Sequence, residues 1–284
     1  MLAQRGSGPS ALRWLIGVEL AHYRNRATLT LAELAVPTGI SKQKLGHLET
    51  AERRQYPTDI TKVLTACGAA QHDIDRLTTL AGMTDSTTWW GPWSDVVPDW
   101  LGTFVGLERL ATNEFIFGPI TLPGLMQTPE YARELTYAAL RVRRDHAERT
   151  IEFRMERARR LTDGETPLHL HTVVTEQALR LNVGTSDVMA AQYDYLIELA
   201  DRPNVTLQVV TPERGPHGAV NGQFVLLDFE IARSIGYVEL QDGAIYVQHA
   251  GAVDTYQESA RSLKTVALPP DESVGFIADL RKRL

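Results

Sequence analysis

Two lysines lie at the expected start of a short helix in the segment GISKQKLGHLE, residues 39–49. Ser41 is a typical N-cap residue, and Lys42 and Lys44 follow it within the first turn. A helix N-terminus carries a partial positive charge, so a cation there is unfavourable unless an anion lies nearby. Contact with a polyanion such as nucleic acid would offset this cost at both positions.

The outward residues of this helix can form hydrogen bonds with the edges of bases. Leu45 and Leu48 are expected to face the core. Lysine can donate to O6 and N7 of guanine, and glutamine can bind adenine through two hydrogen bonds. The predicted base-reading residues are Lys42, Gln43, Lys44 and His47. The predicted phosphate contacts are Ser41, through its backbone N–H, and Arg53, Arg54, Arg24 and Arg26.

A turn between two helices should hold these side chains in place. Thr30 and Glu33 form a capping box that predicts the start of the preceding helix. Pro37 should end that helix early, and Gly39 should supply the sharp turn into the helix over residues 42–49. Two helices joined in this way form the helix-turn-helix layout, whose second helix enters the major groove of DNA with its N-terminus first.

Three further helices complete a bundle. The spacing of apolar residues predicts one helix over residues 11–26, and patterns ending in glycine predict others over residues 58–68 and 71–82. The sequence therefore predicts an all-α five-helix DNA-binding domain over residues 11–82, preceded by a flexible tail of residues 1–10. Helical hairpins with surface lysines also occur outside DNA-binding proteins, but the five-helix context favours the DNA-binding interpretation.

Charge is distributed unevenly along the chain. The whole sequence of 284 residues has a net charge of −6. Residues 1–84 contain ten basic and seven acidic residues, a net charge of +3, whereas residues 85–284 contain 19 basic and 28 acidic residues, a net charge of −9. This asymmetry indicates that the N-terminal part, and not the remainder, meets a polyanion.

The composition is typical of a soluble globular protein rather than a disordered one, with 43% hydrophobic and 23% charged residues. No apolar run reaches the roughly 18 residues that a membrane span needs, and the N-terminal segment lacks the apolar core of a signal peptide. Cys67 is the single cysteine, which excludes an internal disulfide and fits a reducing compartment. We therefore expect a cytoplasmic, nucleoid-associated protein without membrane contact.

The second part of the chain has a mixed pattern. A Trp-rich linker is expected at residues 83–93, followed by an α+β, or mixed α/β, domain over residues 94–284. The expected strands, about five in number, are residues 168–174, 204–210, 223–229, 234–240 and 244–249. The apolar segment 115–127 contains prolines and glycines, so it is expected to be irregular and buried. A charged helix over residues 144–161 is expected to be a solvated or bridging face rather than a second nucleic-acid surface.

Four tryptophans near the domain junction could also do chemistry. Trp89, Trp90, Trp93 and Trp100 could form a ligand cage or stack on bases. Large aromatic residues at such a junction are more often packing anchors, which is the favoured interpretation.

Three histidines raise the possibility of an enzyme. His169 and His171 are two residues apart on a predicted strand and share one face, where metal binding or acid–base catalysis is conceivable. No third ligand follows at a metal-site spacing. His217 lies in a glycine-rich loop that lacks a phosphate-cradling pattern. Catalysis by these histidines is therefore the minor alternative, and we expect a protein that is not an enzyme and uses no cofactor or metal.

Both parts of the chain resemble known families. Residues 14–81 resemble the phage-repressor-type, or XRE-type, helix-turn-helix domain, because LAELA, GIS and the final LE of LTLAELAVPTGISKQKLGHLETAERR fall in its register. Residues 89–280 are similar to the C-terminal domain of a group of actinobacterial regulators, through FVGLERLATNEF, LPGLMQTPEYARELTYA, TEQALRLNVG, PNVTLQVV and GQFVLLDF. The resemblance implies a transcriptional regulator, often encoded beside a small partner protein and described as antitoxin-like.

The sequence leads to two hypotheses that can coexist. The first is a transcriptional regulator that binds a palindromic operator as a homodimer through residues 11–82, while residues 94–284 bind an effector or partner and hold the dimer together. The second is an antitoxin-like protein-interaction module, whose acidic C-terminal domain sequesters a small partner protein.

Overall fold

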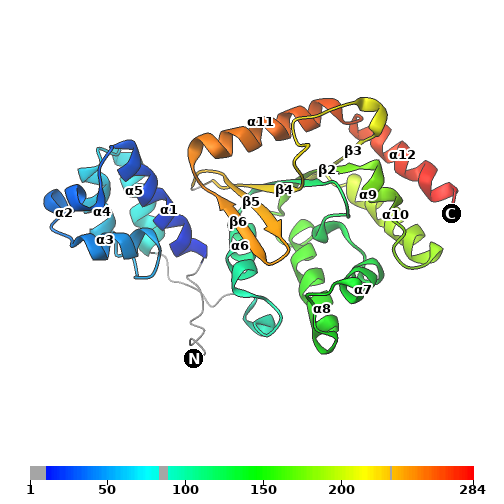
Figure 1. Ribbon diagram of the computed structural model, residues 1–284, viewed down its shortest axis with the longest axis horizontal. Helices are drawn as coiled ribbons and strands as arrows, with labels where there is room; N and C mark the ends of the chain where they lie inside the picture. Colours follow the sequence, from blue (N-terminus) through cyan, green and yellow to red (C-terminus); the bar gives the residue numbers. More distant parts are fainter. Residues whose placement is uncertain (1–10, 83–88, 231) are drawn as a thin grey trace. The chain divides into compact units, whose positions relative to one another are not determined.

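A computed structural model describes residues 11–82, 89–230 and 232–284 (Figure 1). The chain forms two compact units. The N-terminal unit comprises Met1–Gly91, Pro98–Leu110 and Phe229–Arg233, and the C-terminal unit comprises Pro92–Val97, Ala111–Asp228 and Ser234–Leu284. The tail predicted at residues 1–10 and residues 83–88 of the predicted linker lie outside the described residues.

The N-terminal unit is helical. Its helices are α1 (Ala11–Arg26), α2 (Leu31–Thr38), α3 (Lys42–Glu49), α4 (Pro57–Ala66), α5 (Gln71–Gly82) and α6 (Asp99–Leu110). The first five confirm the predicted five-helix bundle. The expected domain boundary assigned α6 to the second domain, but α6 packs closely on α1, since a Cβ added at Gly106 would lie 2.6 Å from the Cβ of Ala11.

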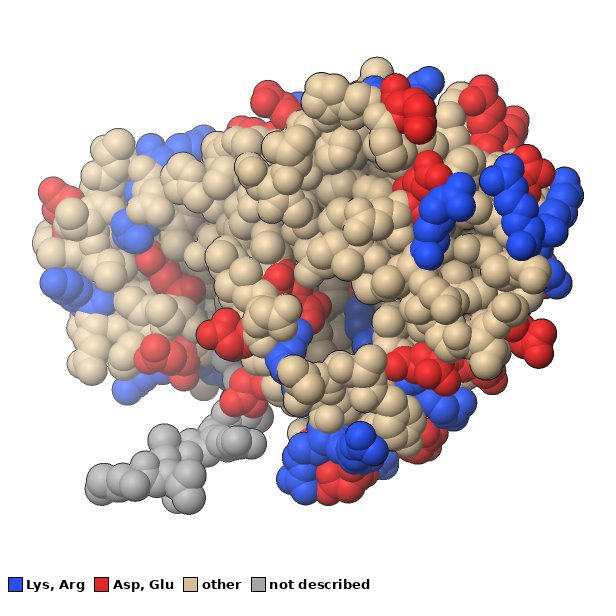
Figure 2. Space-filling model, turned by 45° about the vertical axis from the view of Figure 1, so that its right-hand side comes forward, with Lys and Arg blue, Asp and Glu red and all other residues tan. Residues whose placement is uncertain are grey.

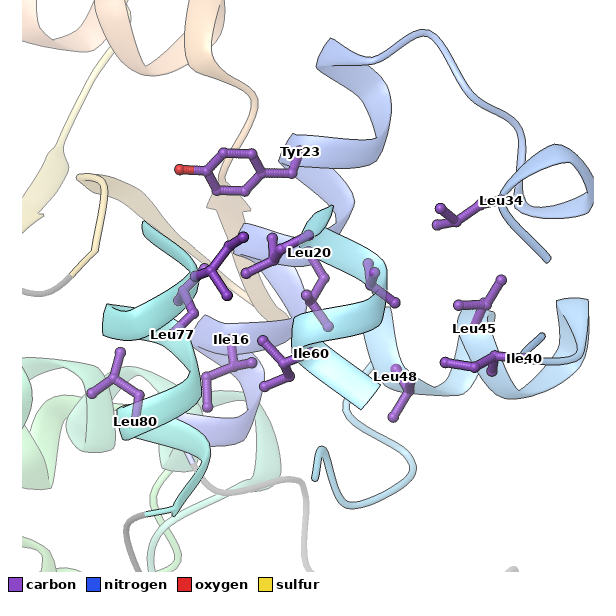
Figure 3. Close-up of a cluster of buried hydrophobic side chains, with 13 residues drawn as sticks. Ile16, Leu20, Tyr23, Leu34, Ile40, Leu45, Leu48, Ile60, Leu77 and Leu80 are labelled. Atoms are coloured by element: carbon purple, nitrogen blue, oxygen red, sulfur yellow. The ribbon is translucent and has the colours of Figure 1, made fainter. Parts of the chain in front are cut away.

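A compact apolar core holds these short helices together (Figure 3). It takes at least one fully buried side chain from each of the first five helices, namely Leu20, Leu34, Leu48, Ile60 and Leu77. Isolated helices of this length are marginal in water. Complete burial of each leucine or isoleucine contributes about 1.5–3 kcal/mol, so tertiary packing is what makes the bundle stable.

The start of α2 confirms the predicted capping box. The Oγ1 of Thr30 accepts a hydrogen bond from the backbone N–H of Glu33 at 3.2 Å, and Oε2 of Glu33 accepts one from the N–H of Thr30 at 2.8 Å. The prediction that Pro37 ends α2 early is wrong, because the helix continues to Thr38. Proline has a helical φ and in the last turn removes only one hydrogen bond. The helix ends at Gly39, whose φ of 64° is in the left-handed region.

The C-terminal unit is built on a six-stranded mixed sheet in the order β3-β2-β1-β4-β5-β6. The strands are β1 (Asn113–Gly118), β2 (His169–Thr175), β3 (Val205–Val210), β4 (Phe224–Asp228), β5 (Ile235–Leu240) and β6 (Gly243–Val247). β1 pairs in parallel with β2 and antiparallel with β4, so it joins the parallel and antiparallel parts of the sheet. The α+β fold class is therefore confirmed.

One central strand was not predicted. The expectation of an irregular segment at residues 115–127 is wrong for its first residues, which belong to β1. Every residue of β1 from Glu114 to Gly118 is buried, so the strand shows no alternation of polar and apolar residues. The remainder of the segment is irregular, with a 3-10 turn η2 at Gly124–Met126. The sheet thus has six strands rather than about five.

Helices cover both faces of this sheet (Figure 1). Along one face lies α11 (Ala250–Val266), and on the other lie α7 (Pro129–Ala138), α8 (Ala147–Ala158) and α10 (Ser186–Ala200). The short helix α9 (Glu176–Arg180) follows β2, and α12 (Pro270–Lys282) ends the unit. Under α11, the aromatic rings of Phe115, Phe117 and Phe224 pack with Leu263 into a second apolar core.

Candidate nucleic-acid interface

The N-terminus and the inward side of α3 are fixed as predicted. The Oγ of Ser41 accepts a hydrogen bond from the backbone N–H of Lys44 at 3.2 Å, which confirms Ser41 as the N-cap. Leu45 and Leu48 are 2% and 0% exposed, and Ile40 in the turn is also buried. Because this stripe is held in the core, the opposite side of α3 must face outward.

The outward side of α3 presents a stripe of polar side chains. Lys42, Gln43 and Thr50 are exposed, and the side chain of His47 is 30% exposed. Gln43, His47 and Thr50 are separated by four and three residues, so they lie on one helix face. Thr50 was not among the predicted residues, and only its spacing from His47 could have indicated it.

A glycine in α1 allows the end of α3 to approach closely. A Cβ added at Gly17 would lie 2.3 Å from the carbonyl oxygen of Glu49 and 3.1 Å from that of Leu48. Both contacts are with backbone atoms, which cannot move without shifting α3. Gly17 therefore sets the distance between the two helices. In the sequence it is only a lone glycine inside a helical pattern.

A buried glutamine fastens the same end of α3. The side-chain nitrogen of Gln55 donates to the carbonyl oxygens of Leu48 at 2.7 Å and of Arg13 at 2.9 Å. Gln55 is 2% exposed, so these hydrogen bonds form away from bulk water. Its role was missed because no local pattern distinguishes it from the polar residues around it.

Lys44 forms an ion pair with a residue of the neighbouring helix α4. Its Nζ lies 2.8 Å from Oδ2 of Asp59 on α4, and the two side chains are 36% and 10% exposed. The base-reading role predicted for Lys44 stays a prediction, and it competes with this ion pair. The ion pair also explains how a second lysine is accommodated near this helix end, because the Asp59 carboxylate supplies a neighbouring anion.

Arg24 forms an ion pair inside the bundle. Its Nε and Nη2 donate to the two carboxylate oxygens of Glu49 at 2.6 and 2.9 Å, and its Nη1 donates to the carbonyl of Leu29 at 2.9 Å. The hydrogen bond to Glu49 raises the pKa of Arg24 above its usual value. This two-pronged pair ties the end of α1 to the end of α3. The phosphate contact predicted for Arg24 stays a prediction that now competes with this partner.

Three other arginines of the predicted set are exposed. They are Arg26, Arg53 and Arg54. The guanidinium of Arg26 lies 5.7 Å from the ring centroid of Tyr23, and that of Arg54 lies 5.5 Å from that of Tyr56. Such cation–π contacts orient the side chains without neutralising their charge. The positive charge of these arginines is thus presented at the surface of the N-terminal unit.

The histidines do not form a common site. The Nε2 of His171 lies 2.7 Å from Oε1 of Gln208, whereas His169 is exposed. The Nδ1 of His217 accepts a hydrogen bond from the backbone N–H of Ala219 at 3.2 Å. Within the described ranges, no group of three or more His, Cys, Asp or Glu residues is arranged to hold a metal ion. No helix in the same ranges has the length and apolar character needed to cross a membrane.

The tryptophans pack within two different units. In the N-terminal unit, Nε1 of Trp89 donates to the carbonyl of Val105 at 3.2 Å, and the ring of Trp90 packs against α6. In the C-terminal unit, the ring of Trp93 lies 6.1 Å from that of Phe153. These contacts are those of packing anchors, as the favoured interpretation expected.

Comparison with known families agrees with this geometry. Residues 15–77 match the model described as a helix-turn-helix domain, so the N-terminal unit has the fold of DNA-binding regulators. Residues 101–279 match the model described as a domain of unknown function, DUF5753. The chain belongs to this DUF5753 family. A search of curated proteins and a search of solved structures found no match.

Proposed function

We propose that the chain is an XRE-type transcriptional regulator that binds a specific operator through α3. The main support is the position of Lys42, which is exposed directly behind the N-cap of the second helix of the helix-turn-helix. Within the described chain, Lys42 forms no ion pair, in contrast to Lys44, which pairs with Asp59. An exposed cation at a helix N-terminus is unfavourable in the isolated protein and favourable against phosphate or guanine.

The exposed residues divide into two proposed roles. Lys42, Gln43 and His47 read base edges from the outward stripe of α3. The backbone N–H of Ser41 and the side chains of Arg53, Arg54 and Arg26 bind phosphates on either side of it. Lys44 and Arg24 support this surface through Asp59 and Glu49, and they would reach DNA only by giving up those partners.

A homodimer is part of the proposal. One small helix-turn-helix domain contacts a single half-site, and a second linked domain raises affinity through effective concentration. The operator would then be roughly palindromic, with half-site centres about 34 Å apart or a multiple of that distance. The C-terminal unit would carry dimerisation and effector binding, and the protein would act in the cytoplasm at the nucleoid without catalysing a reaction.

The salt dependence of operator binding tests the role of Lys42. Lys42→Ala should weaken binding through the lost base contact, and if its amine also neutralises a phosphate, the slope of log K against log salt concentration should fall by about 0.9. Lys62→Ala is the matched control, because Lys62 is an exposed lysine of the same unit on α4. Fluorescence anisotropy with a promoter fragment at several salt concentrations measures both. Equal slopes and affinities for Lys42→Ala and wild type would remove Lys42 from the interface.

One observation favours a second candidate function. Residues 85–284 have a net charge of −9, which suits a basic protein partner. In this alternative the chain is an antitoxin-like module that sequesters a small protein encoded nearby. Co-expression of the full chain with that neighbouring protein, followed by size-exclusion chromatography, should give a stoichiometric complex that dissociates at high salt. Separate elution at low salt would contradict it.

A further inference from the structure

The sheet face opposite α11 carries polar side chains in its interior. Phe115 belongs to the apolar core under α11, and side chains alternate along a strand, so Glu114 and Ile116 lie on the opposite face. The strand register carries this face across to Tyr237, because Ile116 pairs with Val225 and Val225 pairs with Tyr237. Glu114 is 2% exposed and Tyr237 is 3% exposed, so this face is covered.

Arg154 of α8 is partly buried with a neutral partner. Its Nη1 donates to Oε1 of Gln127 at 2.6 Å. Gln127 is itself buried and donates to the carbonyl of Leu122 at 2.7 Å. Among the ion pairs of the described residues none involves Arg154. By contrast, Nε of Arg149, which is on the same helix α8, lies 2.8 Å from Oδ2 of Asp95.

A partly buried guanidinium whose hydrogen-bond partner is neutral is unfavourable. Burial, followed by repulsion from Arg157, lowers the pKa of Arg154 to about 10. The group therefore stays charged at neutral pH, and the free energy of holding it away from water is not recovered by an ion pair. Such a group is stabilised when an anion binds to it.

Other polar side chains converge on the same place. A Cβ added at Gly124 would lie 3.8 Å from Cδ of Arg154 and 3.9 Å from Nη1 of Arg157. Burial, followed by the charge of Glu239, raises the pKa of Tyr237, and the charges of Arg157 and Arg141 act in the opposite direction.

The cluster contains both basic and acidic side chains. Arg141 is paired with Glu239, its Nη2 lying 2.9 Å from Oε1. Glu239 and the buried Glu114 are carboxylates of this face, and Arg141, Arg154 and Arg157 are basic residues of the same cluster. A space-filling view shows a hollow in the face that it draws, with atoms of basic residues visible inside it (Figure 2).

We propose that this cluster is a binding site for a small organic anion bearing a carboxylate or phosphate group. Arg154 would hold the anionic group with two parallel hydrogen bonds, and Arg157 would supply a second positive charge. Tyr237 would line the site from the sheet, and Gln127 would line it from the end of η2. That the anion acts as an effector rests on the proposed regulatory function, whereas its binding does not.

Calorimetric titration of the full chain tests the site. Inorganic phosphate and citrate are the two probes, each compared with chloride at equal ionic strength. The wild type should bind at least one of them saturably, and Arg154→Met should weaken that affinity by about tenfold or more. Arg159→Met is the matched control, because Arg159 is 63% exposed just beyond the same helix, and it should bind as the wild type does.

Two results would overturn the proposal. One is the absence of saturable binding of either probe by the wild type, and the other is an unchanged affinity in Arg154→Met. If Arg154→Met fails to fold, Arg154→Lys keeps the charge without the planar fork and should still bind more weakly than the wild type. Equal affinity of Arg154→Lys and wild type would then count against the site.

The site and the regulatory function can fail separately. Anion binding that depends on Arg154, in a protein that does not prefer its promoter to random DNA, would support the site and remove the regulatory role. Specific promoter binding with no probe binding would support the regulatory role and contradict the anion site. A change in promoter affinity on adding the probe, absent in Arg154→Met, would support both.

Discussion

The two lysines at the start of α3 have different surroundings. Lys42 is exposed, whereas the amine of Lys44 lies 2.8 Å from the carboxylate of Asp59. One therefore faces solvent, where DNA is proposed to bind, and the other joins α3 to α4. The same residue type has two different roles at positions two apart, because among the described residues Lys44 forms an ion pair with a carboxylate and Lys42 does not.

Substitution of each lysine should distinguish the stabilising ion pair of Lys44 from the proposed DNA contact of Lys42. Lys44→Ala should lower the free energy of unfolding of the N-terminal unit by about 0.5–1 kcal/mol, because the pair is partly exposed and its strength is screened. Lys42→Ala should leave that free energy unchanged or raise it by a few tenths of a kcal/mol, since it breaks no ion pair of the described residues and removes a cation from the first turn of α3. Urea denaturation followed by circular dichroism measures both. Equal stability of the two variants would show that the Lys44–Asp59 pair does not stabilise the bundle.

Burial of a histidine makes stability depend on pH. Burial lowers the pKa of His171 below its usual value of 6.5, and the charge of Lys264 acts in the same direction. The unfolded chain then binds the proton more tightly, so this contribution to stability is complete above about pH 6.5 and falls as the pH decreases towards the folded pKa.

His171→Gln should therefore lose less stability than the wild type between about pH 7 and pH 5. The measurement is thermal unfolding across that range, with the slope rather than the absolute stability compared. His169→Gln on the same strand is the control, because His169 is exposed, and it should keep the wild-type slope. Parallel curves for all three proteins would show that His171 is not responsible.

At the level of the elements, the close packing of α1 against α3 fixes the position of α3, which carries the candidate interface. Gly17 leaves room for the carbonyl of Glu49, Gln55 holds that of Leu48, and Arg24 pairs with the Glu49 carboxylate. All three act at the C-terminal end of α3. Its N-terminal end, which is proposed to meet DNA, is held by the Ser41 cap and the core leucines.

A methyl group at Gly17 should disturb this packing. Gly17→Ala should destabilise the N-terminal unit by about 1–3 kcal/mol, because its Cβ would lie 2.3 Å from the carbonyl oxygen of Glu49. Gly46→Ala is the matched control within α3, since its Cβ would meet Leu31 at an ordinary 3.7 Å, and it should be neutral or stabilising. Hydrogen exchange of α1 and α3 measures both, and similar protection in the two variants would contradict the prediction.

At the level of the whole molecule, the N-terminal unit takes in a segment from much later in the chain. Phe229–Arg233, between β4 and β5, belongs to this unit. The Nε of Arg233 lies 2.9 Å from Oε1 of Glu19 in α1, and Nη2 of Arg76 lies 3.8 Å from the other oxygen. Glu19 is 1% exposed, so its carboxylate depends on these arginines.

Removal of Arg233 should leave a poorly compensated buried carboxylate. Arg233→Met should destabilise the N-terminal unit, towards the lower end of the roughly 3–5 kcal/mol expected for a broken buried pair, because Arg233 is 30% exposed and Arg76 remains. Adding Glu19→Gln to Arg233→Met should restore part of the loss, since the unpaired charge is then absent. Chemical denaturation of both proteins measures this. No recovery in the double variant would show that the charge is not the cause.

Local signals in the sequence were sufficient for the outline of the N-terminal unit. The capping box at Thr30, the N-cap Ser41, the turn at Gly39 and the inward Leu45 and Leu48 were all predicted and are present. Each involves residues no more than a few positions apart, so the chain itself places them side by side. The candidate interface could be located from sequence for the same reason.

The tertiary structure determined the features that depend on residues far apart in the chain, namely the central strand β1 and the partners of several charged side chains. It made Asn113–Gly118 a central strand, because both neighbouring strands and the helices that cover the two faces of the sheet come from later in the chain. It turned Lys44 towards Asp59 and Arg24 towards Glu49, and it brought Arg233 to Glu19. A charged side chain pairs with an opposite charge that the fold brings close to it. When the two residues are far apart in the chain, their spacing in the sequence does not predict the pair.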